Sequence, residues 1–206
     1  LGKLAISESC HQKKRTVNFS SVLSDSIGHH IYGEIWANNI KKELKANGLL
    51  ERPIHIISAN MHSVLNTLYA PNALPKEAKN SKQFELYQLL SNENSKPLQK
   101  KTKQFASKNG LIYIKDTSGT NINVQIIDTQ KIDLSKTQFQ KLHSKGKDPV
   151  IIVMDYAFGE QAYETMDELL KPYKENGNST HLDVESISIM GKAGILEGGK
   201  GDIMIP

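Results

Sequence analysis

The run VIIVMD, from Val150 to Asp155, constrains the fold more than any other stretch of the chain. Its first five residues are apolar, and the run has the length of one β-strand. A continuous apolar strand needs cover on both faces, which is typical of parallel strands in α/β proteins. We therefore expect a buried strand with Asp155 at its carboxyl end.

A helix and a second strand are expected after this run. The helix spans 159–173, and its inner stripe includes Met166 and Leu169. We expect Asn176 and Gly177 to close the helix. The next apolar run, SISIM at 186–190, completes a β-α-β unit whose strands should be parallel neighbours with a right-handed crossover.

The glycine-rich stretch at 191–206, GKAGILEGGKGDIMIP, follows the second strand. Ligands of open α/β sheets bind at the carboxyl ends of the strands, and glycines let a ligand approach the main chain closely. We expect Gly191, Ala193 and Gly194 to form a floor of small residues beside a ligand, and Ile203–Pro206 to form a further strand. A tight connection without a ligand explains the glycines equally well.

The residues before this unit predict an α+β extension. The whole chain is then an α/β protein with a mostly parallel sheet flanked by helices. We expect a polar basic arm over 1–23, an N-terminal α/β region over 24–147, and a second domain over 148–206. The elements expected before residue 150 are a helix over 24–47, a strand over 54–58 leading to a helix capped by Asn60, helices over 81–90 and 97–108, a hairpin over 111–128, a short helix over 135–143 and a linker over 144–149.

The helix expected over 97–108 is basic. Its lysines could touch phosphates, but a solvated helix face explains them as well. Aromatic side chains do not interleave with the lysines as they would on a base-stacking surface, so we do not expect a nucleic-acid partner. The lysines in and beside this helix are Lys96, Lys100, Lys101, Lys103 and Lys108.

Polar residues also gather where the strand over 54–58 ends. They could form a second polar pocket, although helix capping and core packing explain them too. The residues are His55, Ser58, Asn60, His62 and Ser63.

Composition points to a cytoplasmic protein. The 206 residues carry 26 Lys and Arg against 22 Asp and Glu, an excess too small to imply a nucleic-acid partner. The single cysteine, Cys10, excludes an internal disulfide and suits a reducing compartment. We find neither a membrane-spanning run nor a signal-peptide core, and no Walker loop, GxSxG elbow or zinc-ligand spacing. The ends at Leu1 and Pro206 look cut from a longer chain.

The order of residues over 148–206 resembles the nucleoside phosphorylase and nucleosidase superfamily. The resemblance rests on the strand followed by G-x-A-G, on a later G-D-I-M-I segment, and on VIIVMDYAFGE upstream. Three features depart from the family pattern. The family usually has a pair of strands and another helix between the first strand and the glycine turn, whereas only about 35 residues intervene here. Ile195 replaces the second glycine of the family turn, and the ribose clamp and the leaving-group aspartate of the family would lie beyond Pro206.

The resemblance implies cleavage of an N-glycosidic bond by water or phosphate. It implies that Glu160 orients the nucleophile or a ribose hydroxyl; a carboxylate favoured at a helix N-terminus is the alternative. Lys192 could meet a phosphate or face solvent. Asp155 is either a ligand group or a turn cap. We expect no resident cofactor or metal, with phosphate as the conceivable co-substrate.

Two functions of different classes remain open. The first is an enzyme that cleaves a purine nucleoside or nucleotide, of which this chain holds the N-terminal part. The second is a non-catalytic nucleotide-binding or interaction module in which Ile195 fills the space of a base. Both take a small nucleoside or nucleotide as partner, need no membrane, and are compatible with a homo-oligomer.

Overall fold

The computed structural model describes residues 30–80, 83–137 and 148–191. The chain divides into two compact units, Leu1–Ile31 and Tyr32–Pro206, and the whole sheet belongs to the second.

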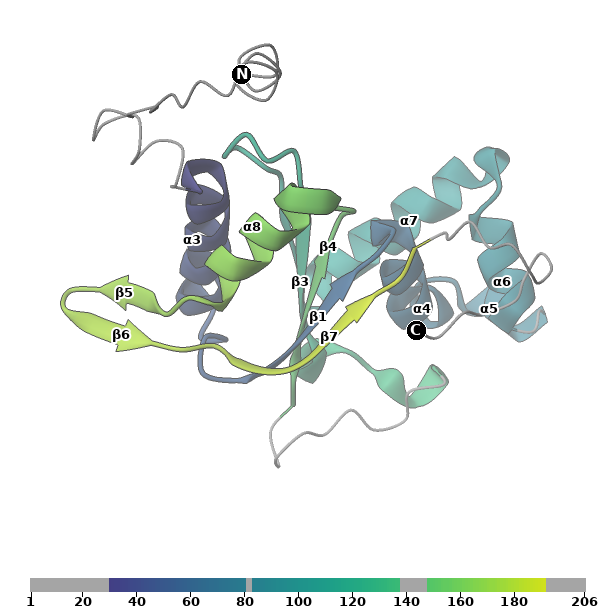
Figure 1. Ribbon diagram of the computed structural model, residues 1–206. Coiled ribbons are helices and arrows are strands. Elements are labelled where there is room, and N and C mark those ends of the chain that lie inside the picture. Colours follow the sequence, from purple (N-terminus) through teal and green to yellow (C-terminus); the bar gives the residue numbers. More distant parts are fainter. Residues whose placement is uncertain (1–29, 81–82, 138–147, 192–206) are drawn as a thin grey trace, which may run out of the picture. The chain divides into compact units, whose positions relative to one another are not determined.

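A five-stranded mixed sheet forms the centre of the second unit (Figure 1). The strand order is β2-β3-β4-β1-β7. The pairs β2–β3 and β3–β4 are antiparallel, whereas β4–β1 and β1–β7 are parallel. The strands are β1 (Pro53–Ser58), β2 (Leu111–Ile114), β3 (Val124–Asp128), β4 (Val150–Met154) and β7 (Asp183–Ile189).

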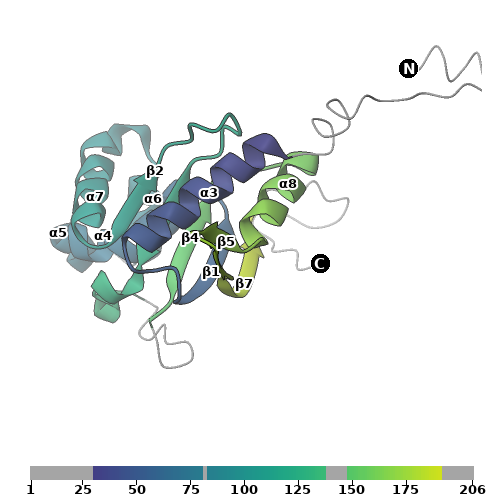
Figure 2. The same cartoon turned by 90° about the vertical axis from the view of Figure 1, so that its left-hand side faces the viewer.

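Helices cover both faces of this sheet. Figure 1 shows α3 and α8 on one side and α4 to α7 on the other, and Figure 2 shows α3 and α8 lying across the strands from their own side. The helices are α3 (Ile31–Ala46), α4 (Met61–Ala73), α5 (Pro75–Asn80), α6 (Gln83–Leu90), α7 (Lys96–Lys108) and α8 (Gly159–Leu170), with short 3-10 turns at Glu93–Ser95, Thr129–Lys131 and Leu134–Lys136.

The alternation of side chains along β4 explains its continuous apolar run. Ile152 packs in one core cluster with Trp36 and Leu44 of α3. Ile151 and Val153 point to the other face and join the cluster of α4 and α7. Every residue of β4 is buried, because each side of the strand meets a helical layer.

The predicted α/β class with a helix-flanked sheet is confirmed, but the prediction of a mostly parallel sheet is wrong. The expected hairpin over 111–128 forms, and its second strand β3 pairs antiparallel with β4. The hairpin thus contributes two antiparallel pairings to the same sheet. Strands from both sides of residue 147 are therefore hydrogen-bonded neighbours.

The two strands of the predicted β-α-β unit run in the same direction, but they are not neighbours. Both β4 and β7 pair in parallel with β1, which lies between them. The prediction of adjacent strands is wrong because β1, from much earlier in the chain, offers apolar side chains to both faces. Ile54 and Ile56 of β1 belong to the core cluster of α3, and Ile57 packs against the cluster of α4 and α7.

The predicted end of helix α8 is also wrong. The helix stops at Leu170, and a small hairpin follows, with β5 (Tyr173–Glu175) antiparallel to β6 (Asn178–Thr180). Asn176 and Gly177 form its two-residue turn, with φ values of 49° and 79°. Asn-Gly is the preferred pair for such a turn because both residues tolerate positive φ.

The other expected helices are found with adjusted ends. The helices predicted over 24–47, 81–90 and 97–108 correspond to α3, α6 and α7, and α5 was not expected. The helix expected over 135–143 is described only as the short turn Leu134–Lys136. The arm over 1–23, the linker residues 144–147 and the strand at Ile203–Pro206 lie outside the described residues.

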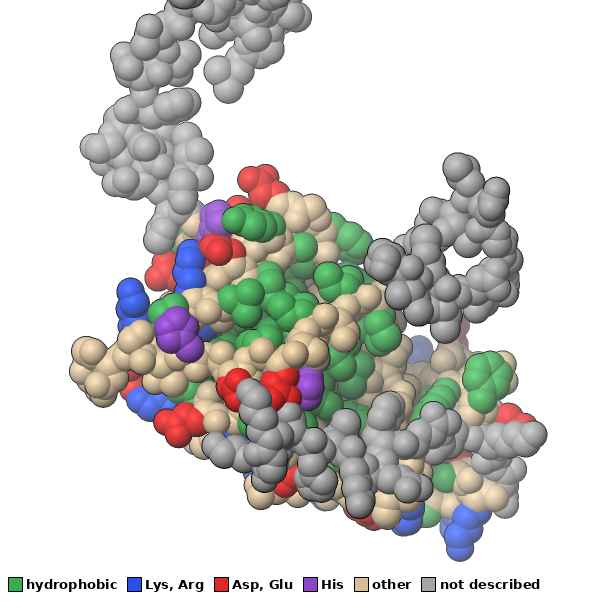
Figure 3. Space-filling view, turned by 60° about the horizontal axis from the view of Figure 1, so that its bottom comes forward, with side chains coloured by type: hydrophobic (Ala, Val, Ile, Leu, Met, Phe, Trp, Pro, Cys, Tyr) green, Lys and Arg blue, Asp and Glu red, His purple; other side chains and the backbone are tan. Residues whose placement is uncertain are grey.

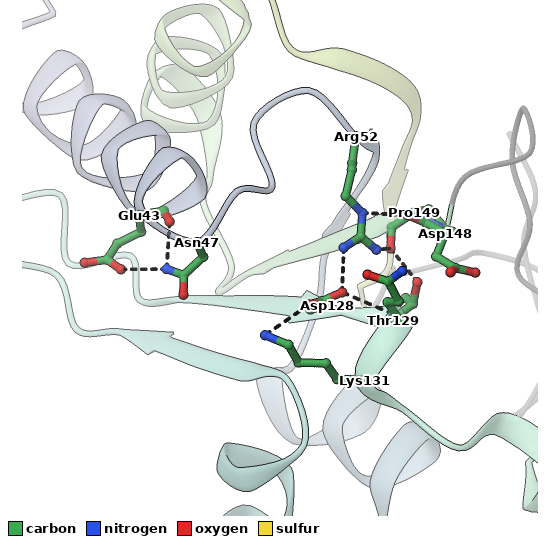
Figure 4. A network of polar contacts seen from close by, with 9 residues as sticks. Glu43, Asn47, Arg52, Asp128, Thr129, Lys131, Asp148 and Pro149 are labelled. Carbon is green, nitrogen blue, oxygen red and sulfur yellow. Dashed lines mark hydrogen bonds and ion pairs between the residues drawn. The ribbon is translucent and has the colours of Figure 1, made fainter.

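A polar network closes the amino-terminal edge of β4 (Figure 4). Arg52 donates to the Asp128 carboxylate at 2.7 Å and to the carbonyl oxygens of Asp148 and Pro149 at 2.8 and 3.3 Å. Burial raises the pKa of Asp128, but the hydrogen bond and charge of Arg52, together with Lys131, outweigh burial and hold this pKa below its ordinary value. The network joins the chain before β1 and β4 to the last residue of β3, at the edge opposite the loops that follow β1 and β4.

Strand β7 lies at one margin of the described sheet. Its side chains Ile187 and Ile189 are 43% and 79% exposed, on the face where α8 covers the neighbouring strands. Figure 3 shows hydrophobic side chains gathered on the face that it views. This margin is less thoroughly covered than β4, where the largest exposed fraction is 6%.

Candidate functional site

The loops after β1 and β4 diverge to opposite faces of the sheet. The two strands are parallel neighbours, yet β1 leads to α4 on one face and β4 leads to α8 on the other. In open α/β sheets, a crevice forms outside the carboxyl ends of two strands whose connections part in this way, and ligands bind there. The topology therefore identifies this edge as the place to search for a site.

A cavity of about 580 Å³ lies at this edge, on the side of α4 and α7. We call it the carboxyl-edge pocket. Its volume falls in the range of small-molecule sites. Its polar lining comes from three places: Asn60 and His62 at the start of α4, the α7 lysines Lys96, Lys100 and Lys103, and Tyr113, Asn123, Gln125 and Asp155 from the strands and their ends.

Helix α4 points its amino terminus at this pocket. Asn60 caps the helix, as predicted, and its side-chain oxygen accepts a hydrogen bond of 2.9 Å from the backbone N–H of His62. The first turn of α4 contains no acidic residue. The positive end of the helix dipole is therefore uncompensated within the helix and favours a bound anion.

The lysines of α7 divide into two groups. Lys96, Lys100 and Lys103 line the pocket, and their spacing of four and then three residues places them on one face of the helix. Lys101 and Lys108 are not among the lining residues. The ammonium of Lys103 also lies 4.6 Å from the centroid of the Tyr113 ring. The lining thus holds three lysines and one carboxylate, that of Asp155.

Gln125 is the least expected residue of the pocket. It lies on β3, only 3% exposed, on the face that also carries Ile127 toward α4 and α7. Its side-chain oxygen Oε1 is buried and has no hydrogen-bond partner among the described residues. An unpaired buried acceptor costs about 1–3 kcal/mol. A ligand group that donates a hydrogen bond would remove that cost.

Asp155 belongs to the pocket and to the local turn at once. One carboxylate oxygen accepts a hydrogen bond of 2.9 Å from the backbone N–H of Tyr156. Phe158, not Asp155, is the N-cap residue of α8, and it makes no side-chain capping bond. Asp155 is half-buried and lines the pocket; its role as a ligand group stays a prediction.

The remaining predicted site residues lie apart from this pocket or outside the described residues. Glu160 is exposed in the first turn of α8 and is not among the lining residues. Gly191 follows β7 at the same edge of the sheet, with open space where a Cβ would stand. The other predicted residues, Lys192, Ala193 and Gly194, lie outside the described residues.

Sequence reasoning missed three contributors from the hairpin, Tyr113, Asn123 and Gln125. A signal for Gln125 was present, because it is the one polar residue inside the apolar run VQII. A polar side chain in a buried strand needs a partner or a function.

None of the helices in the described ranges is long and apolar enough to span a membrane. No curated protein and no solved structure matches the chain. A family model described as a family of unknown function (DUF6909) matches residues 70–206, well over half of the chain, and the protein therefore belongs to that family.

Proposed function

We propose that the carboxyl-edge pocket binds a phosphorylated sugar. Within that class of ligands, the resemblance to nucleoside phosphorylases and nucleosidases suggests a nucleotide. The proposal rests on one combination of groups. Lys96, Lys100, Lys103 and the start of α4 favour an anion, while Gln125 and Asp155 offer acceptors to hydroxyl groups.

The two kinds of group select against simpler ligands. Inorganic phosphate would satisfy the lysines, but at neutral pH it keeps only one or two P–OH donors, fewer than the hydroxyl groups that a sugar phosphate offers to Gln125 and Asp155. An uncharged sugar would pair with Gln125 and Asp155 but leave the lysines without a counter-charge. A sugar phosphate carries both the anion and the hydroxyl donors.

An adjoining cavity provides room for a larger ligand. It measures about 470 Å³ and shares Asn60, His62, Asn66 and Gln99 with the carboxyl-edge pocket. A ligand that enters both cavities passes the amino terminus of α4 between them. This continuity supports a ligand of nucleotide size over a bare sugar phosphate.

Cleavage of an N-glycosidic bond stays a prediction of the resemblance, and the Glu160 on which it depends lies outside the lining of the carboxyl-edge pocket, in the first turn of α8. In that reaction, Glu160 orients water or phosphate, and Gly191 with Lys192, Ala193 and Gly194 lines the space for the sugar and base. Binding without cleavage is the alternative. Both forms require that a phosphorylated or glycosidic ligand enters this edge of the sheet.

Calorimetric titration with AMP, adenosine, ribose 5-phosphate and inorganic phosphate tests the binding. The Lys100→Ala variant should weaken AMP and ribose 5-phosphate about tenfold, the loss of one charge-assisted contact. Lys101→Ala is the matched control, because its side chain is exposed on the same helix outside the lining. Equal weakening by both variants, or no binding of any of the four compounds at millimolar concentration, would exclude the proposal.

The catalytic form has its own readout. Release of free adenine from AMP or adenosine by the chain, lost in Glu160→Gln, would support cleavage. Binding of AMP without release of adenine would favour the binding module.

A further inference from the structure

His55, Ser186 and Glu185 form a second polar constellation, on β1 and β7. The His55 Nδ1 and Ser186 Oγ atoms are 2.7 Å apart, and the two residues are direct partners in the parallel pairing of β1 with β7. The His55 Nε2 atom lies 3.9 Å from a carboxylate oxygen of Glu185. One imidazole thus faces a hydroxyl on one nitrogen and a carboxylate on the other.

A bulge in β7 creates this arrangement. Ile54 pairs with Val184, but the next residue, His55, pairs with Ser186, so Glu185 is the extra residue of β7. Consecutive residues of a regular strand point to opposite faces. The bulge breaks that alternation and lets both Glu185 and Ser186 approach the same ring, as bulges do when they re-aim side chains near functional sites.

The carboxylate selects the tautomer of His55. An anion beside Nε2 favours the ring form with the proton on Nε2, which leaves the lone pair of Nδ1 facing Ser186. The hydroxyl of Ser186 then donates to Nδ1. A hydroxyl hydrogen-bonded to a neutral imidazole, which a third group orients, is the geometric mark of an activated serine nucleophile.

An apolar cavity of about 480 Å³ adjoins this pair and is lined by both of its members. Ile57, Val64, Leu68 and Met190 supply its apolar walls. Ser188 lines it as well, two residues beyond Ser186 on β7 and therefore on the same face. This cavity suits an apolar acyl group placed beside the serine hydroxyl.

We propose that Ser186 is the nucleophile of a hydrolytic site for carboxylic esters of small apolar acids. Ser186 Oγ bonds to the ester carbonyl carbon while its proton moves to His55 Nδ1. The bond from that carbon to the alkoxy oxygen breaks, and His55 returns the proton to the departing alcohol. Water then attacks the acyl-serine in the same way, releasing the carboxylic acid and restoring Ser186.

The neighbouring groups have distinct parts in this chemistry. His55 is the base and then the acid, and Ser188 offers its hydroxyl to the negative oxygen of the tetrahedral intermediate. Glu185 is a positioning residue, which holds the ring tautomer and stabilises the imidazolium by its charge. The reaction needs only the ester and water.

Labelling with a fluorophosphonate probe and hydrolysis of p-nitrophenyl butyrate test the proposal. We expect labelling of the intact chain that Ser186→Ala abolishes and that Ser179→Ala, an exposed serine of the β5–β6 hairpin, leaves unchanged. His55→Gln should slow ester hydrolysis at least a hundredfold. Absence of labelling in the intact chain, or labelling that survives in Ser186→Ala, overturns the proposal.

The role of Glu185 has a separate test. Glu185→Gln should lower kcat about tenfold with little change in KM, and Glu185→Asp should restore part of the rate, whereas a merely structural role would not separate the two constants. Lys101→Ala should leave ester hydrolysis unchanged, because Lys101 lines neither the carboxyl-edge pocket nor this cavity, and ester hydrolysis is measured independently of nucleotide binding. Failure of this proposal is therefore distinguishable from failure of the binding proposal above.

Discussion

Arg52 donates a 2.7 Å hydrogen bond to Asp128, and their side chains are 15% and 5% exposed. The pair joins residues 76 positions apart, at the end of the sheet opposite the carboxyl-edge pocket. Arg52 also holds the chain just before β4 through the carbonyl oxygens of Asp148 and Pro149. This pair therefore fixes β4, the strand that Asp155 directly follows.

Asp128→Asn should destabilise the protein by about 2 kcal/mol at pH 7, because the charged acceptor of Arg52 is lost while the carbonyl contacts remain. The pKa of Asp128 is depressed in the folded state, so its stabilisation is present above about pH 4 and disappears as the pH falls further. Urea unfolding at pH 7 and pH 3 checks this. An equal difference between the two proteins at both pH values would contradict the assignment.

Part of this fold could be read from short stretches of sequence. The run VIIVM predicted a buried strand because each of its faces needs an apolar side chain, and the hairpin over 111–128 followed from two β-branched runs around a turn. The position of β1 between β4 and β7 could not be read in the same way. Strand order depends on packing between segments far apart in the chain, and no local pattern encodes it.

The candidate site shows the same limit. The sequence singled out several residues of the pocket, but only as separate features: Asp155, Asn60, His62 and the α7 lysines. Whether they line one cavity depends on the pairing of β1 with β4, which the sequence does not show. The sequence alone also could not show that Lys100 lines the pocket and Lys101 does not, because that depends on which face of α7 turns toward the pocket.

Gly110→Ala should be strongly destabilising, by about 3 kcal/mol or more. Gly110 connects α7 to β2 with φ of 94°, and an added Cβ would lie 2.8 Å from the carbonyl oxygen of Asp128. The variant therefore suffers backbone strain and a clash with main chain. Thermal unfolding measures the loss.

Gly48→Ala is the matched control for Gly110→Ala. Gly48 also has positive φ, 69°, but nothing lies within 4 Å of an added Cβ. Only the conformational cost of about 1 kcal/mol applies. A similar loss of stability in the two variants would contradict the steric clash between the added Cβ at position 110 and the carbonyl oxygen of Asp128.

Lys41→Met should remove one contribution to the pH dependence of the free energy of unfolding at alkaline pH. Lys41 is buried beneath the end of α8, where its ammonium donates 2.7 Å hydrogen bonds to the carbonyl oxygens of Glu168 and Lys171. Burial lowers the pKa of Lys41, and the charge of Glu168 raises it. Burial has the larger effect, and the pKa is about 8. Between pH 8 and about 10.4 the folded state therefore binds fewer protons than the unfolded one, and this group makes stability rise with pH.

The measurement for Lys41 is a difference between two proteins. Other lysines and tyrosines titrate in the same range, so the free energy of unfolding of Lys41→Met is subtracted from that of the unaltered chain at pH 7.5, 9 and 10.5. The difference should shift in favour of the unaltered chain as the pH rises. A difference independent of pH would show that Lys41 keeps its ordinary pKa in the folded state.

Gln125→Leu should stabilise the protein by about 1 kcal/mol while weakening the binding of ribose 5-phosphate. The buried Oε1 of Gln125 has no partner among the described residues, so an apolar side chain of similar size removes an uncompensated desolvation cost. Gln161→Leu is the matched control, because Gln161 donates a 2.6 Å hydrogen bond to the carbonyl oxygen of Thr120 and its loss should destabilise. Thermal unfolding and calorimetric titration measure the two effects. A destabilised Gln125→Leu variant would mean that Gln125 serves the fold rather than a ligand, since residues kept at a cost in stability are typical of binding sites.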